Sequence, residues 1–479
     1  MKIFIFILAC LLIFVNNYAQ PGYPPDKYVN LDDIPDSAEI VYTSFVHPSN
    51  IYGGYQIYYF IDSSTTKFKN LSLLKEITLD LNFIPQEMID FGQNIEILKM
   101  RSNHYKMSNN IENAQLHDTI KNLLLLNKLP NLTTVYISGF YIDEENQLVN
   151  NELRIAQSNN QSRFFSFVDV EILNISEHVL CTKLYLHTTK ISNIKGLVQN
   201  TFIKEMYLSK LNFIKLPENL PPSLEKLEVS NCDSLTDISN LSEYPKLSSF
   251  IIHTGSKIKQ FPKKLQSEIF STIEIDYIRP ERVVEFMEFI SNAKTIEWLK
   301  IGTCRGEGIG KIDVDFRNNK VTIGTLDING NCFDSRAPIQ LNGIDSLSVT
   351  NLYLNGVFDE IPAFSKIKDL RKLYFGSCYP MNKETMEELF KLKNLSEFRI
   401  SNIKVNVIPE RFFKNNTSLV SLSIVGSEIK NLSFHNCILI NLRHFHIAGN
   451  MNLEKIPKKM YYPNAYLNLY GNKKEKYTN

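Results

Sequence analysis

Three groups of residues in this sequence have types and spacing that could support chemistry. His444 and His446 alternate on one predicted strand and share a face, so they could hold a metal ion if a third ligand were present. Residues 306–310 are rich in glycine, but residues 311–316 then alternate like a strand, whereas phosphate binding needs a helix N-terminus. The carboxylate pairs of the chain have the spacing of solvated positions. With no hydrolase or protease nucleophile motif present, we expect no enzymatic activity, no metal site and no cofactor.

The elements that position these residues follow from one recurring spacing. An apolar residue is followed by two variable residues, an apolar residue, one variable residue and a third apolar residue. Fifteen such triplets occur in one phase between about Leu71 and Asn472. The middle apolar residues from Met206 to Leu467 lie 21 to 27 residues apart, and a fixed period of this length indicates a repeat architecture.

This pattern resembles the leucine-rich-repeat superfamily, in which the period is about 20–29 residues. The resemblance implies an α/β solenoid, a leucine-rich-repeat horseshoe with a parallel concave sheet and an irregular or short-helical convex side. Apolar spacing predicts convex helices over residues 283–290 and 386–390, and a degraded strand near residues 165–170. The richness in Asn, Ile and Lys, and the Ala-Gln end of the first apolar segment, resemble exported Bacteroidetes proteins.

A second position of the repeat is expected to form a structural ladder. Five residues beyond the middle apolar residue, leucine-rich-repeat proteins place an Asn or Cys that satisfies backbone groups of the neighbouring turn. That position is occupied here by Asn103, Cys232, Cys304, Asn331, Cys378, Asn450 and Asn472. Cys181 replaces an apolar residue of its triplet, so it and the three ladder cysteines are predicted to be free thiols. The state of Cys332 and Cys437 is left open.

The N-terminal region predicts export. Residues 1–19 resemble a signal peptide, because the apolar run over residues 3–15 is too short for a stable membrane span. An uncleaved anchor and lipidation at Cys10 are the alternatives. Residues 20–70 lack the repeat and are predicted to form an N-terminal cap, and residues 71–479 the solenoid. We expect a secreted or cell-surface protein with no membrane span after signal removal.

The function expected from the repeat is recognition. A formal charge of +1 gives no field that would attract nucleic acid, so we expect no nucleic-acid partner. The residues between and just after the last two apolar positions should face outward on the concave sheet, where tyrosine pairs make good anchors. The predicted ligand contacts are Tyr185, Tyr207, Trp298, Lys300, Tyr353, Tyr374 and Arg399. We therefore expect a non-catalytic extracellular or cell-surface protein that recognises a protein or glycan. The alternative is a structural, self-associating cell-envelope component.

Overall fold

The chain divides into two compact units, Met1–Leu173 and Asn174–Asn479. In the first unit, the computed structural model describes residues 40–42, 75–79, 93–101, 129, 131–138, 141–142, 164–168 and 171–172. In the second, it describes residues 181–187, 190–191, 197–198, 200–218, 220–253, 255–303, 312–317, 320–330, 338–356, 358–360, 363–376, 383–403, 406–432, 434, 437–454 and 462–472. The predicted signal peptide lies outside the described residues, as does most of the predicted cap.

The described part of the first unit is a stack of parallel strands. Its main sheet contains β1 (Ile40–Tyr42), β2 (Glu76–Leu79), β3 (Ile97–Arg101), β4 (Thr134–Ser138) and β6 (Phe164–Val168). A second ladder joins β5 (Tyr141–Ile142) and β7 (Glu171–Ile172). The middle residues Ile77, Leu98 and Val135 are buried, so the triplet phase sets the inward face. Strand β6 confirms the degraded strand predicted near residues 165–170.

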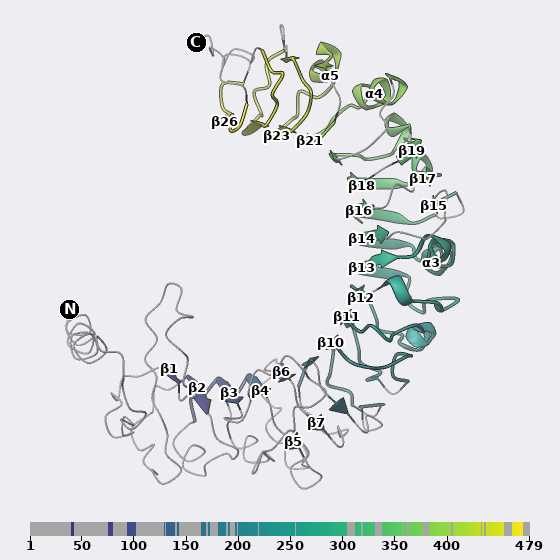
Figure 1. The fold of residues 1–479 in the computed structure, drawn as a ribbon, viewed down its shortest axis with the longest axis vertical. Coiled ribbons are helices and arrows are strands. Elements are labelled where there is room, and N and C mark those ends of the chain that lie inside the picture. Colours follow the sequence, from purple (N-terminus) through teal and green to yellow (C-terminus); the bar gives the residue numbers. More distant parts are fainter. Residues whose placement is uncertain are drawn as a thin grey trace, which may run out of the picture. The chain divides into compact units, whose positions relative to one another are not determined.

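In the second unit, the described residues form thirteen parallel strands in one sheet. They are β8 (Lys183–His187), β10 (Glu205–Ser209), β11 (Lys226–Ser230), β12 (Ser249–Ile252), β13 (Ile269–Ile278), β14 (Thr295–Thr303), β16 (Thr322–Asn329), β18 (Ser348–Asn355), β20 (Lys372–Gly376), β21 (Glu397–Ser401), β23 (Ser421–Val425), β25 (His444–Ala448) and β26 (Tyr466–Asn468). Figure 1 shows β10 to β26 side by side along the inner side of an arc, which we call the concave face. The parallel solenoid expected from the repeat is therefore confirmed.

The convex side of this unit contains short helices and short strands (Figure 1). The α-helices are α3 (Val283–Ile290), α4 (Lys383–Phe390) and α5 (Glu410–Asn415). The 3-10 helices are η7 (Ser239–Glu243), η8 (Gly255–Lys257), η9 (Pro280–Arg282), η10 (Ile344–Ser346) and η11 (Phe364–Lys366). Short strands are β9 (Lys190–Ile191), β15 (Ile312–Asp315), β17 (Ile339–Asn342), β19 (Phe358–Glu360), β22 (Val407–Ile408) and β24 (Asn431–Leu432). Helix α3 has its predicted bounds, α4 begins earlier than predicted, and α5 was not predicted. Among the described residues, no helix is both long and apolar enough to span a membrane.

Aromatic side chains fill the space between the sheet and the convex side. The rings of Phe398 and Phe412 lie 4.6 Å apart between their centroids, which joins strand β21 to helix α5. Phe413 continues the contact to Phe434 at 4.4 Å, and Phe434 contacts Phe445 of strand β25 at 5.7 Å. These buried rings connect successive turns and form part of one continuous core.

The two C-terminal residues of the predicted ladder tie each turn to the preceding one. Asn450 is fully buried, and its Oδ1 accepts a hydrogen bond of 2.9 Å from the Ser427 backbone N–H. Its Nδ2 donates to the Ile424 carbonyl at 2.9 Å. Asn472 repeats this arrangement one turn later, because its Oδ1 accepts from the Asn450 N–H and its Nδ2 donates to the Ile447 carbonyl. Short polar side chains thus satisfy the buried bends.

The described cysteines are buried thiols. Cys181, Cys232 and Cys437 form no disulfide bond, which confirms the prediction for the first two and answers the open question for the third. The Sγ of Cys232 lies 3.8 Å from the Leu208 carbonyl of the preceding turn. The remaining predicted ladder residues lie outside the described residues: Asn103, Cys304, Asn331 and Cys378.

The residue just before the ladder position turns the chain through the left-handed region. Positive φ angles recur there at Asn231 (52°), Asn402 (54°), Gly426 (59°), Gly449 (65°) and Gly471 (73°). Asn and Gly tolerate this conformation better than other residues do. This Gly or Asn position is a signal of the repeat that our reading of the sequence overlooked.

Candidate functional site

The strand register of the second unit aligns six of the seven predicted contact residues, all but Trp298, in one row across the concave face. Tyr353 pairs with Tyr374, and Tyr374 pairs with Arg399 on the next strand. The row continues through Ser423 and His446 of strands β23 and β25. Because each of these residues lies between two buried apolar residues, all point to the same side of the sheet.

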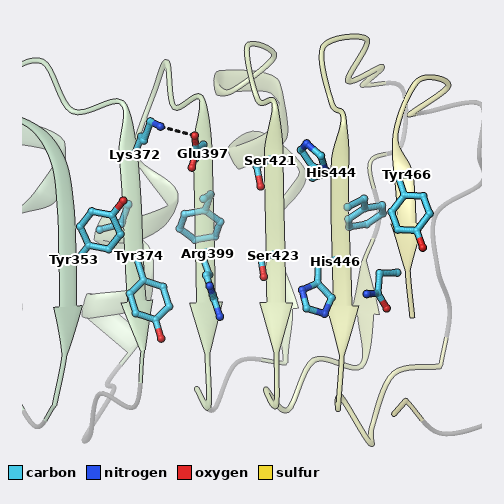
Figure 2. Close-up of a pocket in the computed structure, with 14 residues that line it drawn as sticks. Tyr353, Lys372, Tyr374, Glu397, Arg399, Ser421, Ser423, His444, His446 and Tyr466 are labelled. Carbon is cyan, nitrogen blue, oxygen red and sulfur yellow. Dashed lines mark ion pairs between the residues drawn. The ribbon is translucent and has the colours of Figure 1, made fainter. Parts of the chain in front are cut away.

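A second row of outward side chains lies beside the first. It contains the residues just before the middle apolar positions, and Figure 2 shows them along the same strands. These residues are Lys372, Glu397, Ser421, His444 and Tyr466. Tyr466 has 73% of its surface exposed, and the Lys372 ammonium pairs with Glu397 at 2.5 Å.

From this second row the sequence predicted only Trp298, because it otherwise expected exposure at the position just after the last apolar residue. That position faces the concave side but is covered on several strands. Ser209, Ser401 and Ala448 are all buried there. The Tyr374 hydroxyl lies 3.1 Å from the Ser401 hydroxyl, so the larger tyrosine covers the smaller residue of the neighbouring strand.

The two rows enclose an open groove between strands β18 and β26, with a volume of about 630 Å³. The strand residues between the two rows, among them Phe398 and Phe445, form its floor, and their rings pack on the opposite side of the sheet. Tyr, Arg, Ser, His and Asn side chains form its walls, so aromatic surface is combined with hydrogen-bonding groups of both donor and acceptor type.

The aromatic side chains at the β18 end of the groove are held in place by mutual contacts. The ring centroids of Tyr353 and Tyr374 lie 6.2 Å apart, and those of Trp298 and Tyr353 lie 6.4 Å apart. The Arg399 guanidinium lies over the Tyr374 ring at 4.9 Å, within cation–π distance. Because these rings are ordered before a ligand arrives, binding costs little additional side-chain entropy.

One polar group in the groove lacks a partner. Ser423 is buried, and within the described part of the chain its hydroxyl has no hydrogen-bond partner. A buried hydroxyl without a partner costs about 1–3 kcal/mol of stability. Because it has no partner, this hydroxyl is not hydrogen-bonded to the adjacent His446, whereas a catalytic serine would be hydrogen-bonded to its base.

The other predicted tyrosine pair lies on strands β8 and β10, away from this groove. The Tyr185 and Tyr207 rings lie 6.3 Å apart. The Tyr207 hydroxyl donates to Glu205 Oε2 at 2.7 Å, and Lys226 lies over its ring. Burial raises the pKa of Tyr207 well above its usual range, and the hydrogen bond to Glu205 adds to this effect. Tyr207 is thus already engaged by its own chain.

Between these two regions, strands β12 to β16 carry a cluster of ionisable groups, which we call the ionic cluster. It contains His253, Glu274, Asp276, Lys300 and Asp327. The Lys300 ammonium lies 2.5 Å from Glu274 Oε1 and 3.0 Å from Asp276 Oδ1. The predicted contact residue Lys300 is therefore occupied by ion pairs in its own sheet.

Ionisation in the ionic cluster follows from these contacts. The hydrogen bond with Asp276 raises the pKa of His253. Burial alone would raise the pKa of Asp276, but the hydrogen bonds from His253 and Lys300 outweigh it and lower this pKa. Burial raises the pKa of Asp327 to about 6; the Lys300 ammonium opposes this, and neighbouring carboxylates add to it. The pKa of Asp327 therefore lies well above that of an exposed aspartate.

Comparisons with known proteins identify the fold. No protein-family model and no curated protein matches this sequence. Among solved structures, the chain is similar to TLR13 in a TLR13–ssRNA13 complex, with 17% identity over 85% of this chain and a TM-score of 0.51. The match covers 54% of the TLR13 chain, so this chain spans about half of its length. A leucine-rich-repeat protein of Leptospira interrogans is 14% identical over 83% of this chain and 84% of its own, with a TM-score of 0.40. The similarity to TLR13, together with the parallel sheet, shows that the chain has the leucine-rich-repeat fold.

Proposed function

We propose that this chain is a non-catalytic recognition protein that acts outside the cell or at its surface and binds a protein partner through the concave face. The groove between β18 and β26 carries the proposal, since aromatic side chains in mutual contact line an open surface there. The export segment predicted over residues 1–19 supports an extracellular location.

The composition of the groove favours a protein ligand. Tyr, Trp and Arg contribute most of the binding energy in protein interfaces, and Tyr353, Trp298 and Arg399 lie together here. Trp298 has 38% of its surface exposed beside Tyr353, so a partner side chain could pack against both rings. A glycan ligand is the competing outcome of the experiment below.

The RNA in the TLR13 complex belongs to that protein. On the concave face of this chain, Glu274, Asp276 and Asp327 lie at the centre of the sheet. Carboxylates repel a phosphate backbone, and protein–nucleic acid affinity depends on cationic contacts to phosphate. We therefore do not extend RNA binding to this chain.

The test compares the chain from Gln20 to Asn479 with a Tyr353→Ala/Tyr374→Ala variant in a surface-protein pull-down and on a glycan array. The matched control is Tyr185→Ala/Tyr207→Ala, which removes the tyrosine pair at the other end of the same sheet. We expect a protein to be captured by the parent and the control but not by the groove variant, with circular dichroism showing all three folded. Light scattering after size exclusion measures self-association.

Three results would contradict the proposal. Capture that survives in the groove variant and is lost in the control would move the site to strands β8 and β10. Binding to glycans alone would replace the protein ligand with a sugar. Concentration-dependent oligomers without any captured partner would support the structural, self-associating alternative.

A further inference from the structure

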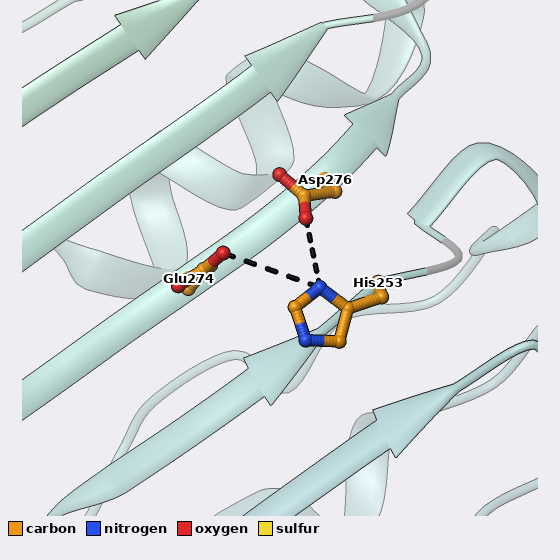
Figure 3. Close-up of side chains that lie close together, drawn as sticks. All are labelled: His253, Glu274 and Asp276. Atoms are coloured by element: carbon orange, nitrogen blue, oxygen red, sulfur yellow. Dashed lines mark hydrogen bonds and ion pairs between the residues drawn. The ribbon is translucent and has the colours of Figure 1, made fainter. Parts of the chain in front are cut away.

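The ionic cluster brings together one imidazole and two carboxylates on the concave face. His253 directly follows strand β12, and Glu274 and Asp276 both lie on strand β13 (Figure 3). Ile275 between the two carboxylates is fully buried, so both acidic side chains point to the concave side. One ligand atom from each of the three side chains lies within 4.8 Å of the other two.

These separations suit a shared metal ion. His253 Nδ1 lies 2.8 Å from Asp276 Oδ2 and 4.0 Å from Glu274 Oε1. A tetrahedral ion with bonds of about 2.0–2.2 Å places its ligand atoms roughly 3.4 Å apart, so small side-chain rotations suffice. The exposed fractions of the three side chains are 36%, 15% and 18% in sequence order, which leaves a path for an ion from solvent.

A fourth residue, Glu228, lies where it can orient His253 as a metal ligand. Glu228 Oε1 lies 3.7 Å from His253 Nε2, the imidazole nitrogen opposite the one that faces Asp276. Histidines that bind a metal through one nitrogen usually donate the other N–H to a carboxylate, which fixes the tautomer and the ring orientation. Glu228 can therefore orient His253 so that Nδ1 presents its lone pair to an ion.

Two glycines keep the space around Asp276 open. A Cβ atom at Gly302, on the neighbouring strand, would lie 3.0 Å from Asp276 Oδ1. A Cβ atom at Gly255 would lie 2.6 Å from the Asp276 carbonyl oxygen. A larger residue at Gly302 would crowd the Asp276 carboxylate, and one at Gly255 would clash with the backbone that positions it.

The Lys300 ammonium would compete with a metal ion for Glu274 and Asp276, but it can pair with Asp327 instead. Strand register places Asp327 directly beside Lys300, on the side opposite Glu274. We propose that His253, Glu274 and Asp276 bind one divalent transition-metal ion of the zinc type, and that Lys300 turns to Asp327 when the ion binds. Imidazole and carboxylate ligands together suit zinc, whereas calcium takes six to eight oxygen ligands.

The test measures zinc binding to the chelator-treated full chain by calorimetry, with zinc chloride as the probe. We expect one zinc equivalent to bind. The variant His253→Ala should lose about 10–100-fold in affinity or more, since outer-shell changes alone cost that much. The matched control His446→Ala removes a concave histidine outside the cluster and should leave the affinity unchanged. Quenching of Trp298, the one tryptophan in the sequence, by cobalt(II) provides a local readout.

A second variant separates a metal site from a purely structural cluster. Lys300→Met removes the competing ammonium, so zinc affinity should rise, and a misfolded protein cannot produce such a gain. If Lys300→Met weakens binding, or if His253→Ala binds zinc as the parent does, the proposal is wrong. A loss confined to His446→Ala would move the ion to the histidines of strand β25.

Discussion

Replacing Asp327 with Asn should stabilise the protein at neutral pH. The pKa of this carboxyl is raised from 3.8 to about 6, mainly by burial. Between these two values the folded state holds a proton that the unfolded state has released. The free energy of unfolding therefore falls as the pH rises through this range. Above the folded-state pKa, the full destabilisation of the folded state by Asp327 remains. Asn keeps the shape of the side chain without the charge.

The magnitude follows from the pKa shift. Each pKa unit corresponds to about 1.4 kcal/mol, so the whole shift corresponds to about 3 kcal/mol of unfolding free energy. Asp327 is only partly buried, and solvent screening reduces the expected gain to about 1–2 kcal/mol at about pH 7. The gain should shrink as pH falls below 6 and be absent near pH 4, where both states of the parent are largely protonated.

The assay is urea unfolding of parent and Asp327→Asn followed by Trp298 fluorescence, in buffers with a chelator, across this pH range. Asp233→Asn replaces an exposed carboxylate and should show no pH-dependent gain. A variant that is no more stable than the parent at neutral pH would refute the reasoning. A gain of equal size at every pH would also refute it, because it would show that charge in the folded state is not the cause.

Three further predictions concern buried residues of the core. Asn450→Ala should cost about 2–4 kcal/mol in thermal unfolding, because it leaves buried backbone groups of the preceding turn unsatisfied, whereas the exposed Asn441→Ala should change little. Phe412→Ala should cost about 3–5 kcal/mol by calorimetry, since its ring contacts both sheet and helix; a smaller loss would show that the cavity collapses. Cys232 and Cys437 should react with a thiol reagent only after denaturation, and a fast reaction in the native protein would contradict their burial.

The repeat made the fold predictable, because its phase is set by the burial of apolar side chains. Once Met206 and Leu227 are both inward, parallel register follows, and Tyr207 must then lie beside Glu228 on the outward face. Helix α5 was not predicted, because its buried residues Phe412 and Phe413 are adjacent in sequence. A segment this short then shows no helical spacing of apolar residues.

The candidate site was predictable as a row of positions but not as a set of contacts. The triplet phase placed Tyr353, Tyr374 and Arg399 in line, yet it could not show that Lys300 is engaged by its neighbours. The ionic cluster was missed because none of the predicted contacts came from the position just after the last apolar residue, where His253 and Asp276 lie. Its geometry depends on which side chain of the neighbouring strand reaches it, and sequence spacing alone does not contain that information.

The division of the concave face into two regions has an energetic reason. In the ionic cluster, Lys300 and His253 already compensate the charge of the carboxylates. A protein partner that covered the cluster would have to desolvate these ion pairs and would gain little binding free energy from them. In the groove, the aromatic rings gain contacts that the free protein lacks. A small cation, which can replace an ammonium group one for one, matches the first region. A partner with an apolar side chain flanked by hydrogen-bonding groups matches the second, so the two sites can act on one sheet without competing for the same side chains.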